Sequence, residues 1–256
     1  DGGNTWTQQI GAGIGYMVSA FFIDSNHGWA VGNDEWGGES VWVRLYTTDN
    51  GGDDWNYSPV SVSATGWFWS IYFDDLNTGW LAGDNGAILK TTDGGTNWKS
   101  QASGTINTLN SICFIDSTTG WTVGYCYSDG YIYDGTLLKS TDGGTSWLSE
   151  TSKVEAEMLT SVYFADPNNG WVVGHTGKIL KTTDGGLNWI TQTSGTPNYL
   201  NSVFFADLNT GWVVGEGNVI LKSTNGGIDW IVQQHGLGPC AFEDVYFTDL
   251  NTGWVV

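Results

Sequence analysis

Short apolar runs separated by turn residues follow one another along nearly the whole chain. In the segment 200–230, apolar residues 202–206 lead into an Asp-Leu-Asn-Thr-Gly turn, and a second run, 212–214, ends at Gly215. A third run, 219–223, precedes an Asn-Gly-Gly turn, and a fourth strand begins at Trp230. Runs of this length between Gly, Asn and Asp predict four antiparallel strands joined by tight turns. No stretch carries the 3.6-residue period of a helix, so the predicted fold class is all-β.

This four-strand unit recurs along the chain. Gly-Trp pairs end at Trp29, Trp80, Trp121, Trp171, Trp212 and Trp254, in steps of 51, 41, 50, 41 and 42 residues. That period is typical of propeller blades, which stack because one blade cannot bury both faces of its own sheet. We therefore predict a β-propeller of four-stranded antiparallel blades, six or seven in number. Five blades are expected to be complete in this chain, at about 17–59, 67–102, 109–151, 158–193 and 199–234.

Pieces of the same unit stand at both ends. The chain starts inside the turn before a fourth strand, at 1–6, and stops after a Gly-Trp strand at Val256. The two pieces belong either to one shared blade or to two different blades. We expect residues 1–256 to form a single propeller domain that is a fragment of a longer chain.

The turn between the third and fourth strands reads S/T-x-D-x-G-x-x-W. An Asp in such a turn accepts hydrogen bonds from nearby backbone N–H groups, Gly supplies a positive φ, and Trp covers the blade edge. Two copies depart from the pattern: the copy assigned to Asp49 has one extra residue before its Trp, and Asn225 replaces the Asp. Because Asn keeps the hydrogen bond without the charge, the turn has a structural role. The predicted turn residues are Asp49, Asp93, Asp142, Asp184 and Asn225, with Trp55, Trp98, Trp147, Trp189 and Trp230.

This turn resembles the Asp box of bacterial neuraminidase repeats. The fuller pattern of L-x-S-V-x-F-x-D, T-G-W-x-V-G and G-x-I-L-K-T-T-D-G-G resembles the propeller family of the photosystem II assembly and stability factor, and related repeats of secreted bacterial proteins. The resemblance covers nearly the whole chain. It implies a propeller, often seven-bladed, that acts through protein contacts without catalysis. The basic surface of that family has no counterpart, since Arg44 is the only Arg.

Charge narrows the range of partners. The 256 residues include 8 Lys and Arg against 27 Asp and Glu, a formal net charge of −19. Nucleic acid is excluded because the cations needed to neutralise its phosphates are missing, and an anionic membrane surface is disfavoured for the same reason. No apolar run approaches the roughly 20 residues that span a bilayer, so no membrane insertion is expected. Divalent cations, neutral glycans and basic protein surfaces stay compatible.

The three cysteines do not define a disulfide framework. Cys113, Cys126 and Cys240 allow one disulfide and one free thiol, and the sequence does not choose the pair. Cys113 lies within an apolar run and is expected to be a buried thiol.

Two units carry insertions in the turn between their second and third strands, on the face opposite the Asp boxes. Regular units have ten residue steps from the Gly of the second strand to the Asp of the box, whereas the first and third units have 17 and 18. The inserted and neighbouring aromatic residues, beside carboxylates, are suited to stack on sugar rings or to anchor a protein partner. The alternative is that they extend the hairpins and cover blade edges. The candidate binding residues are Asp34, Glu35, Trp36, Glu39, Trp42, Trp67, Trp69, Tyr127, Tyr131 and Tyr133.

Neither a cofactor nor a metal site is predicted. Hard cations take oxygen ligands, so calcium would use either the carboxylates of Asp34, Glu35 and Glu39 or those of Asp129 and Asp134. Neither segment has a recognised calcium-loop spacing. The three histidines, at 27, 175 and 235, share no zinc-ligand spacing.

Catalysis has weak support. A sialidase holds its substrate carboxylate with several Arg, which one Arg cannot replace, and no nucleophilic triad is evident. A xyloglucanase-like glycoside hydrolase needs two carboxylates and stays as an alternative. Its candidate acids are Asp34, Glu35, Glu39, Asp129 and Glu216.

The sequence thus favours a non-enzymatic binding or scaffold module that recognises a protein or a glycan through the face opposite the Asp boxes. Few Lys, few Cys and many Ser, Thr, Asn and Gly favour an extracellular or cell-surface location, with the periplasm as an alternative. An assembly factor for a membrane protein complex is the other alternative function.

Overall fold

The computed structural model describes residues 16–35, 41–60, 66–128, 131–151, 154, 157–238 and 240–256. The chain divides into two compact units. The first unit holds the described residues up to Thr122 together with Leu138–Ser149. The second holds Val123–Leu137 and Glu150–Val256, so the third sheet contributes residues to both units. Each unit is described by itself.

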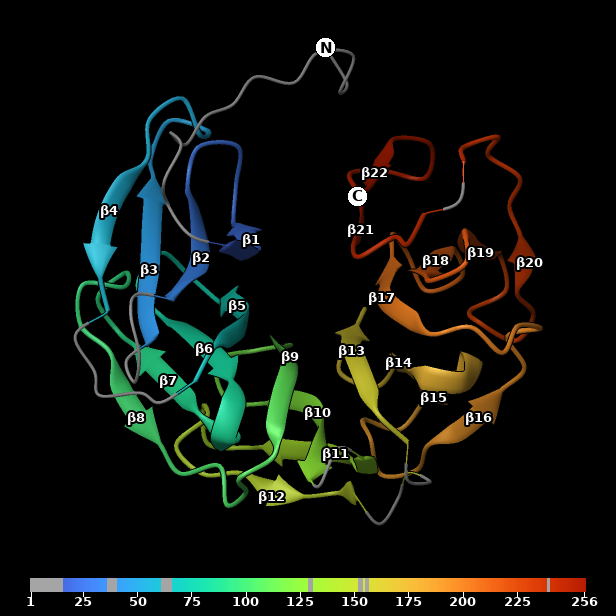
Figure 1. The fold of residues 1–256 in the computed structure, drawn as a ribbon, viewed down its shortest axis with the longest axis horizontal. Helices are drawn as coiled ribbons and strands as arrows, with labels where there is room; N and C mark the ends of the chain where they lie inside the picture. Colours follow the sequence, from blue (N-terminus) through green and yellow to red (C-terminus); the bar gives the residue numbers. More distant parts are fainter. Residues whose placement is uncertain are drawn as a thin grey trace. The chain divides into compact units, whose positions relative to one another are not determined.

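The secondary structure consists almost entirely of antiparallel sheets (Figure 1). Among the described residues, five sheets have four strands each in simple sequential order, and the last sheet has two strands. This confirms the predicted all-β class with five complete four-stranded blades. No helix among the described residues has the length and apolar character needed to cross a membrane.

The strands of the first two sheets are β1 (Tyr16–Phe22), β2 (Gly28–Glu35), β3 (Val41–Thr48) and β4 (Asn56–Pro59), then β5 (Phe68–Phe73), β6 (Gly79–Gly83), β7 (Ile88–Thr91) and β8 (Lys99–Gln101). The third sheet consists of β9 (Thr108–Phe114), β10 (Gly120–Ser128), β11 (Tyr131–Ser140) and β12 (Leu148–Ser149).

The fourth and fifth sheets consist of β13 (Leu159–Phe164), β14 (Gly170–Gly174), β15 (Ile179–Thr182) and β16 (Ile190–Gln192), then β17 (Leu200–Phe205), β18 (Gly211–Gly215), β19 (Val219–Ser223) and β20 (Ile231–Val232). The two-stranded sheet pairs β21 (Val245–Phe247) with β22 (Gly253–Val255). Single 3₁₀ turns, η1 (Asp84–Gly86) and η3 (His175–Gly177), join the second and third strands of the second and fourth sheets.

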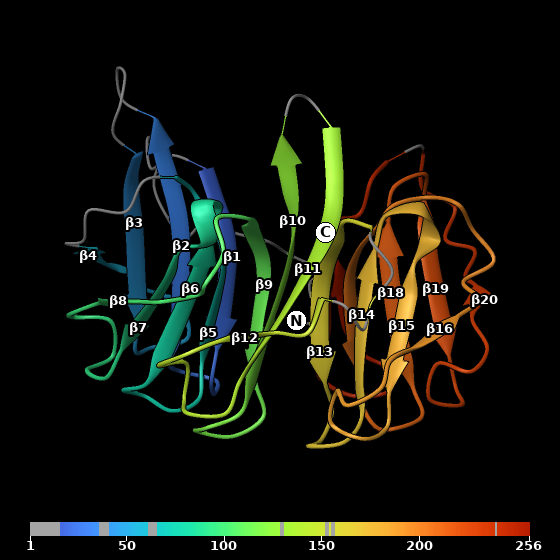
Figure 2. The same cartoon turned by 90° about the horizontal axis from the view of Figure 1, so that it is seen from below.

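The two insertions lengthen hairpins. In the second sheet β6 and β7 have 5 and 4 residues, whereas β2 and β3 have 8 each, and β10 and β11 have 9 and 10. The longer arrows of β2, β3, β10 and β11 can be followed in Figure 2. The described residues of both insertions therefore continue the strands of these blades.

The seam between neighbouring blades is formed by a stack of aromatic rings. Trp80 of β6 lies face to face with Phe114 of the next blade, with ring centroids 3.7 Å apart and planes 14° apart. Trp147, from the Asp box of that next blade, meets Phe114 edge-on at 5.8 Å and 79°. The edge-on contact is one of the favoured geometries of aromatic pairs. The same face-to-face pairing of a Gly-Trp indole with a Phe recurs for Trp29 with Phe73, Trp171 with Phe205, and Trp212 with Phe247.

Polar groups complete the same seam. The Trp80 Nε1–H donates to the Gly143 carbonyl at 3.2 Å, and the Lys90 ammonium donates to that oxygen at 2.6 Å while lying 5.3 Å from the Trp80 ring centroid. The approach requires glycine in the next box residue: a Cβ on Gly144, where φ is +79°, would lie 2.5 Å from the Trp80 nitrogen. The boxes of Asp93, Asp142 and Asn225 thus hold their own turns and each receive the Trp N–H of the preceding blade.

Truncation of a seam Trp tests this account. Trp80 is fully buried, so Trp80→Ala removes a large packed side chain and should lower the free energy of unfolding by about 3–5 kcal/mol. Ile106→Ala is the control, since Ile106 is 83% exposed and its loss should cost less than about 0.5 kcal/mol. Urea titration followed by circular dichroism measures both, and equal losses for the two variants would contradict a seam held by Trp80.

Candidate functional site

Each blade has one end that repeats closely and one that varies. The repeated end is the Asp box, where Asp93 Oδ1 accepts hydrogen bonds from the Thr91 hydroxyl at 2.9 Å and from the Asn97 N–H at 2.8 Å. The Gly95 N–H donates to the Thr91 hydroxyl at 3.0 Å. The equivalent bonds recur in the boxes of Asp142, Asp184 and Asn225. All carboxylate or amide oxygens in these boxes are used within the turn, which supports the predicted structural role.

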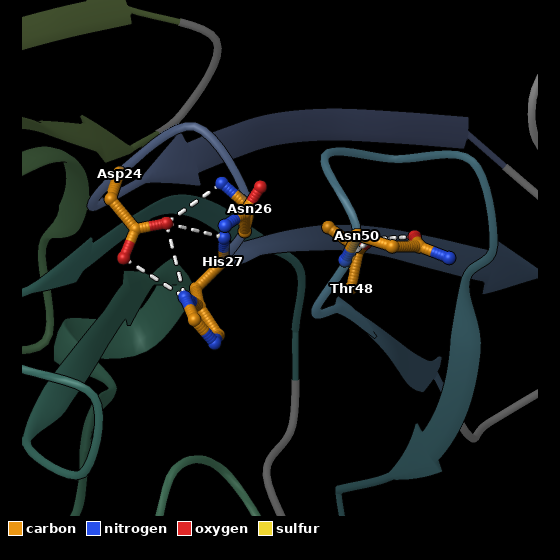
Figure 3. Close-up of polar contacts among 5 residues, drawn as sticks. All are labelled: Asp24, Asn26, His27, Thr48 and Asn50. Atoms are coloured by element: carbon orange, nitrogen blue, oxygen red, sulfur yellow. Dashed lines mark hydrogen bonds and ion pairs between the residues drawn. The ribbon is translucent and has the colours of Figure 1, made fainter.

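The first box differs from the prediction. Asn50, and not Asp49, takes the place of the box Asp. Its Oδ1 accepts from the Thr48 hydroxyl at 2.9 Å (Figure 3) and from the Asp54 N–H at 2.9 Å. Thr48 aligns with Thr91 of the second box, so this copy has no extra residue before its Trp. The sequence assignment was wrong because it searched for a carboxylate where an amide makes the same bonds.

The backbone of the box is hydrogen-bonded to the first turn of its own blade. The Gly51 N–H donates to the Asn26 carbonyl at 2.8 Å, and Gly94, Gly143, Gly185 and Gly226 donate in the same way to the first turns of their blades. In the first turn, Asp24 accepts from the N–H groups of Asn26 and His27 and pairs with the His27 ring at 2.9 Å (Figure 3). These bonds hold the pKa of Asp24 at about 2. The box and the first turn therefore share one end of the blade.

The variable end lies at the turn between the second and third strands. The residue after the Gly of the second strand is Asn33, Asp84, His175 and Glu216 in four blades. Three of these side chains contact the start of the next blade: Asn33 bonds both the N–H and the carbonyl of Phe68, Asp84 accepts from the Thr108 hydroxyl, and the His175 ring stacks on Tyr199. One position therefore supplies a different chemistry to each blade.

A β-bulge contributes to this end. The pairing of β5 with β6 shifts between Phe68 and Ser70, so Trp69 is the extra residue, and the same shift recurs at Thr160 and Asn201. Bulges re-aim a side chain. The Trp69 Nε1–H meets Asp84 Oδ1 at 2.7 Å, and the Trp67 N–H meets Asp84 Oδ2 at 3.0 Å. Both Trp residues were selected from the sequence, but Asp84 was missed. The only sequence signal for Asp84 is its position directly after Gly83 of the second strand.

Aromatic rings continue outward from this carboxylate. Trp67 and Trp69 have ring centroids 5.4 Å apart, and Tyr16, at the start of β1, stacks on Trp67 at 5.9 Å and 24°. Both Trp residues are partly buried, whereas Tyr16 is 68% exposed. We call Tyr16, Trp67, Trp69 and Asp84 the aromatic–carboxylate cluster.

The second unit carries a different group at the same turn. His175 lies flat on Tyr199, with ring centroids 3.5 Å apart and planes 7° apart, and Thr176 donates to the Glu157 carboxylate. Desolvation lowers the pKa of His175, and the charges of Glu216 and Glu157 partly oppose this shift. The His175 ring is thus favoured in its neutral form within a stack.

Several predicted residues fall outside the described part of the chain. Trp36, Glu39 and Asp129 lie outside it, and so do the side chains of Asp34, Glu35, Trp42, Tyr127, Tyr131 and Tyr133, although these residues lie in strands. No three His, Cys, Asp or Glu side chains within the described ranges come together as a metal site. None of the three cysteines forms a disulfide, and desolvation raises the pKa of the Cys113 thiol to about 12.

Comparison with known proteins decides the family. The sequence profile described as "Photosynthesis system II assembly factor YCF48" matches residues 48–150, 104–190 and 149–237. The chain belongs to this family. The match spans the second to fifth blades and part of the first, so the YCF48 family assignment rests on the repeats themselves.

Individual relatives agree with the YCF48 assignment. The "Photosystem II assembly lipoprotein Ycf48" of Synechococcus sp. (strain CC9902) is 33% identical over 78 residues, 30% of this chain and 21% of that protein, so the match spans about a fifth of the relative. The solved structure "YCF48 bound to D1 peptide" has a TM-score of 0.67 at 18% identity, over 94% of this chain and 88% of that one. A GH74 enzyme from Niastella koreensis has a TM-score of 0.70 at 15% identity, over 93% of this chain and 43% of that one. These likenesses confirm the predicted propeller fold.

The corrected box assignment can be tested by a matched pair of variants. Asn50→Ala removes the hydrogen bonds to Thr48 and to the Asp54 N–H and should lower the free energy of unfolding by about 1–2 kcal/mol. Asp49→Ala removes an exposed side chain and should change it by less than about 0.5 kcal/mol. Urea midpoints measure both variants. A larger loss for Asp49→Ala would restore the original assignment.

The boxes also predict a response to acid. Hydrogen bonds from Ser146 and Asn188 hold the pKa values of Asp142 and Asp184 at about 2, below the ordinary value near 3.9 in an unfolded chain. Their contribution to stability is therefore complete above about pH 4 and is lost as the pH falls through 2. The double variant Asp142→Asn, Asp184→Asn should lose less stability than the wild type between pH 4 and pH 2, as measured by urea midpoints at each pH. The exposed Asp53→Asn serves as the control, and parallel pH curves for wild type and double variant would contradict the account.

Proposed function

We propose that this chain is a non-catalytic, protein-binding propeller that assists the assembly of a membrane protein complex. The observation that carries the proposal is the YCF48 family match along residues 48–237. The solved structure "YCF48 bound to D1 peptide" supports recognition of a protein segment by this fold. A protein or peptide, and not a glycan, is therefore the proposed ligand class.

The relative from Synechococcus is a lipoprotein, which supports a membrane-associated, extracytoplasmic location at the cell surface or in the periplasm. The composition of the chain favours a protein partner that is not acidic. With 27 acidic residues against 8 basic ones, long-range attraction favours a neutral or basic segment and repels an acidic one.

The GH74 neighbours favour a glycoside hydrolase as the second candidate. They share the fold at 15% and 16% identity, which carries no activity with it. Retaining and inverting enzymes need two carboxyl groups about 5–10 Å apart across a sugar. Of the five candidate acids, only Glu216 has a described side chain. Its charge acts on the His175 ring, and no pair of candidate carboxyl groups can be placed within the described residues.

Co-purification from native membranes tests the assembly role. The tagged chain, added to detergent-solubilised membranes of its own source cells, should retain subunits of one membrane complex in unassembled form, identified by mass spectrometry, and should not retain the finished complex. A parallel incubation with xyloglucan and mixed-linkage glucan should release no reducing ends. Sugar release that is abolished by a single Asp→Asn or Glu→Gln substitution would replace the assembly role by the hydrolase. Failure to retain any membrane subunit would contradict the assembly role.

A further inference from the structure

We propose that the aromatic–carboxylate cluster of Tyr16, Trp67, Trp69 and Asp84 binds a guanidinium or ammonium side chain of the partner segment. This inference rests on the proposed function and names the partner chemistry that one site recognises. It is drawn from three features: one exposed and two partly buried aromatic rings in contact, a carboxylate fixed beside them, and an excess of acidic residues over basic ones.

The rings form a series that leads from the surface to the carboxylate. Tyr16 is 68% exposed and stacks on Trp67, Trp67 is tilted by 34° on Trp69, and Trp69 donates its Nε1–H to Asp84. Large exposed aromatic side chains in contact with one another are typical anchors of a ligand or a protein partner. Because the Trp69 bond fixes the ring on a strand, little side-chain freedom is lost when a ligand arrives.

The carboxylate is oriented but not neutralised. Asp84 Oδ1 accepts from Trp69 Nε1 and from the Thr108 hydroxyl at 3.2 Å, and Oδ2 accepts from the Trp67 N–H. All three donors are uncharged. A carboxylate offers about four acceptor positions, two on each oxygen, so one position on Oδ2 is still open to a charged donor. A cation beside the rings would meet both a negative charge and the negative face of an indole.

The chain already uses indole faces to hold cations. Lys90, Lys139, Lys181 and Lys222 lie 4.9–5.7 Å from the ring centroids of the seam Trp residues, and Arg44 lies 5.9 Å from the Tyr57 ring. Within the described residues, no such cation lies over Trp67 or Trp69. The cluster therefore offers the same kind of aromatic face as the seams, and the partner segment would supply the cation.

The other described blades do not build the same group. The residue equivalent to Asp84 is a buried Asn33 in the first blade, whose amide bonds the backbone of Phe68, and a His175 stacked on Tyr199 in the fourth. The position of Trp69 holds Thr160 and Asn201 in the fourth and fifth blades. A repeat that needed these residues for its own fold would carry them in each copy, so their presence in one blade favours a ligand.

A glycan would use the rings without the charge, and this difference sets the experiment. The full chain is titrated with an acetylated and amidated Gly-Arg-Gly-Arg-Gly peptide by calorimetry, with a citrulline version of the peptide as the neutral analogue. The Arg peptide should bind and the citrulline peptide should bind at least about tenfold more weakly, because cation–π and ion-pair contacts both require the charge. Added salt should weaken the Arg peptide only.

Two variants and one matched control locate the binding. Trp67→Ala and Asp84→Asn should each weaken the Arg peptide roughly 3- to 30-fold, the range that one cation–π or charged contact supplies. Asp93→Asn removes one charge at the opposite end of β7, where other boxes carry Asn, and should leave the affinity unchanged. Circular dichroism and urea midpoints confirm that each variant is folded. Asp84→Asn removes the charge but keeps only one acceptor oxygen, so it also loses the bond from either Trp69 Nε1–H or the Trp67 N–H. The citrulline peptide and the salt dependence therefore isolate the contribution of charge.

Each remaining outcome overturns the inference. Equal binding of the citrulline peptide, no binding of the Arg peptide at millimolar concentration, or equal losses in Asp84→Asn and Asp93→Asn would each remove the cluster as a cation site. Cello-oligosaccharide binding that is lost in Trp67→Ala but kept in Asp84→Asn would make it a glycan site.

Co-purification with the two variants separates this inference from the proposed function. If the variants retain the membrane subunit as the wild type does, the cluster is not the site, although the assembly role stands; if the wild type retains none, the assembly role itself fails.

Discussion

The stack of Trp on Phe, described for four pairs within the two units, is the contact on which the described architecture depends. A four-stranded blade has two apolar faces, and its second strand is buried along its whole length in β6, β14 and β18. Such a strand is stable only between two neighbours. The indole of Trp80 spans the seam because it offers a flat face to Phe114 and an N–H to Gly143 at once. The box then has two tasks, since the same turn that closes one blade accepts the Trp of the blade before it. This explains why the Gly-Gly pair of the box recurs even where its Asp becomes Asn.

The repeated architecture could be predicted from the sequence because each part of it leaves a local mark. Gly-Trp pairs, Asn-Gly and Asp-Gly turns and apolar runs gave the number of strands, their order and the sheet bounds to within a few residues. The error at Asp49 has a physical cause. A carboxylate and an amide make the same bonds in this turn, so residue type alone did not locate the acceptor, and Asn50 was passed over.

The candidate site was only half predictable. Trp67 and Trp69 were selected because they fall outside the Trp series of the repeat. Asp84 was not, because its importance comes from a bulge that turns Trp69 toward a turn fifteen residues further along. A bulge is a one-residue shift in strand register, and the pattern of apolar residues does not predict register to within one residue. Tyr16 joined the cluster through a contact with the neighbouring blade, which a scan along one unit does not detect.

The two ends of a blade illustrate how a repeat protein separates stability from recognition. The box end uses the same hydrogen bonds in each described copy, so a change that breaks them disturbs the turn and the seam Trp that some of these turns accept. The opposite end bonds the next blade through a different side chain each time, so one copy can change without altering the others. A binding site placed at the box end would compete with the seam for the same donors and acceptors. Recognition is therefore best placed where the repeat tolerates variety, and a charged ligand is best placed beside Asp84, whose carboxyl group is oriented by uncharged donors.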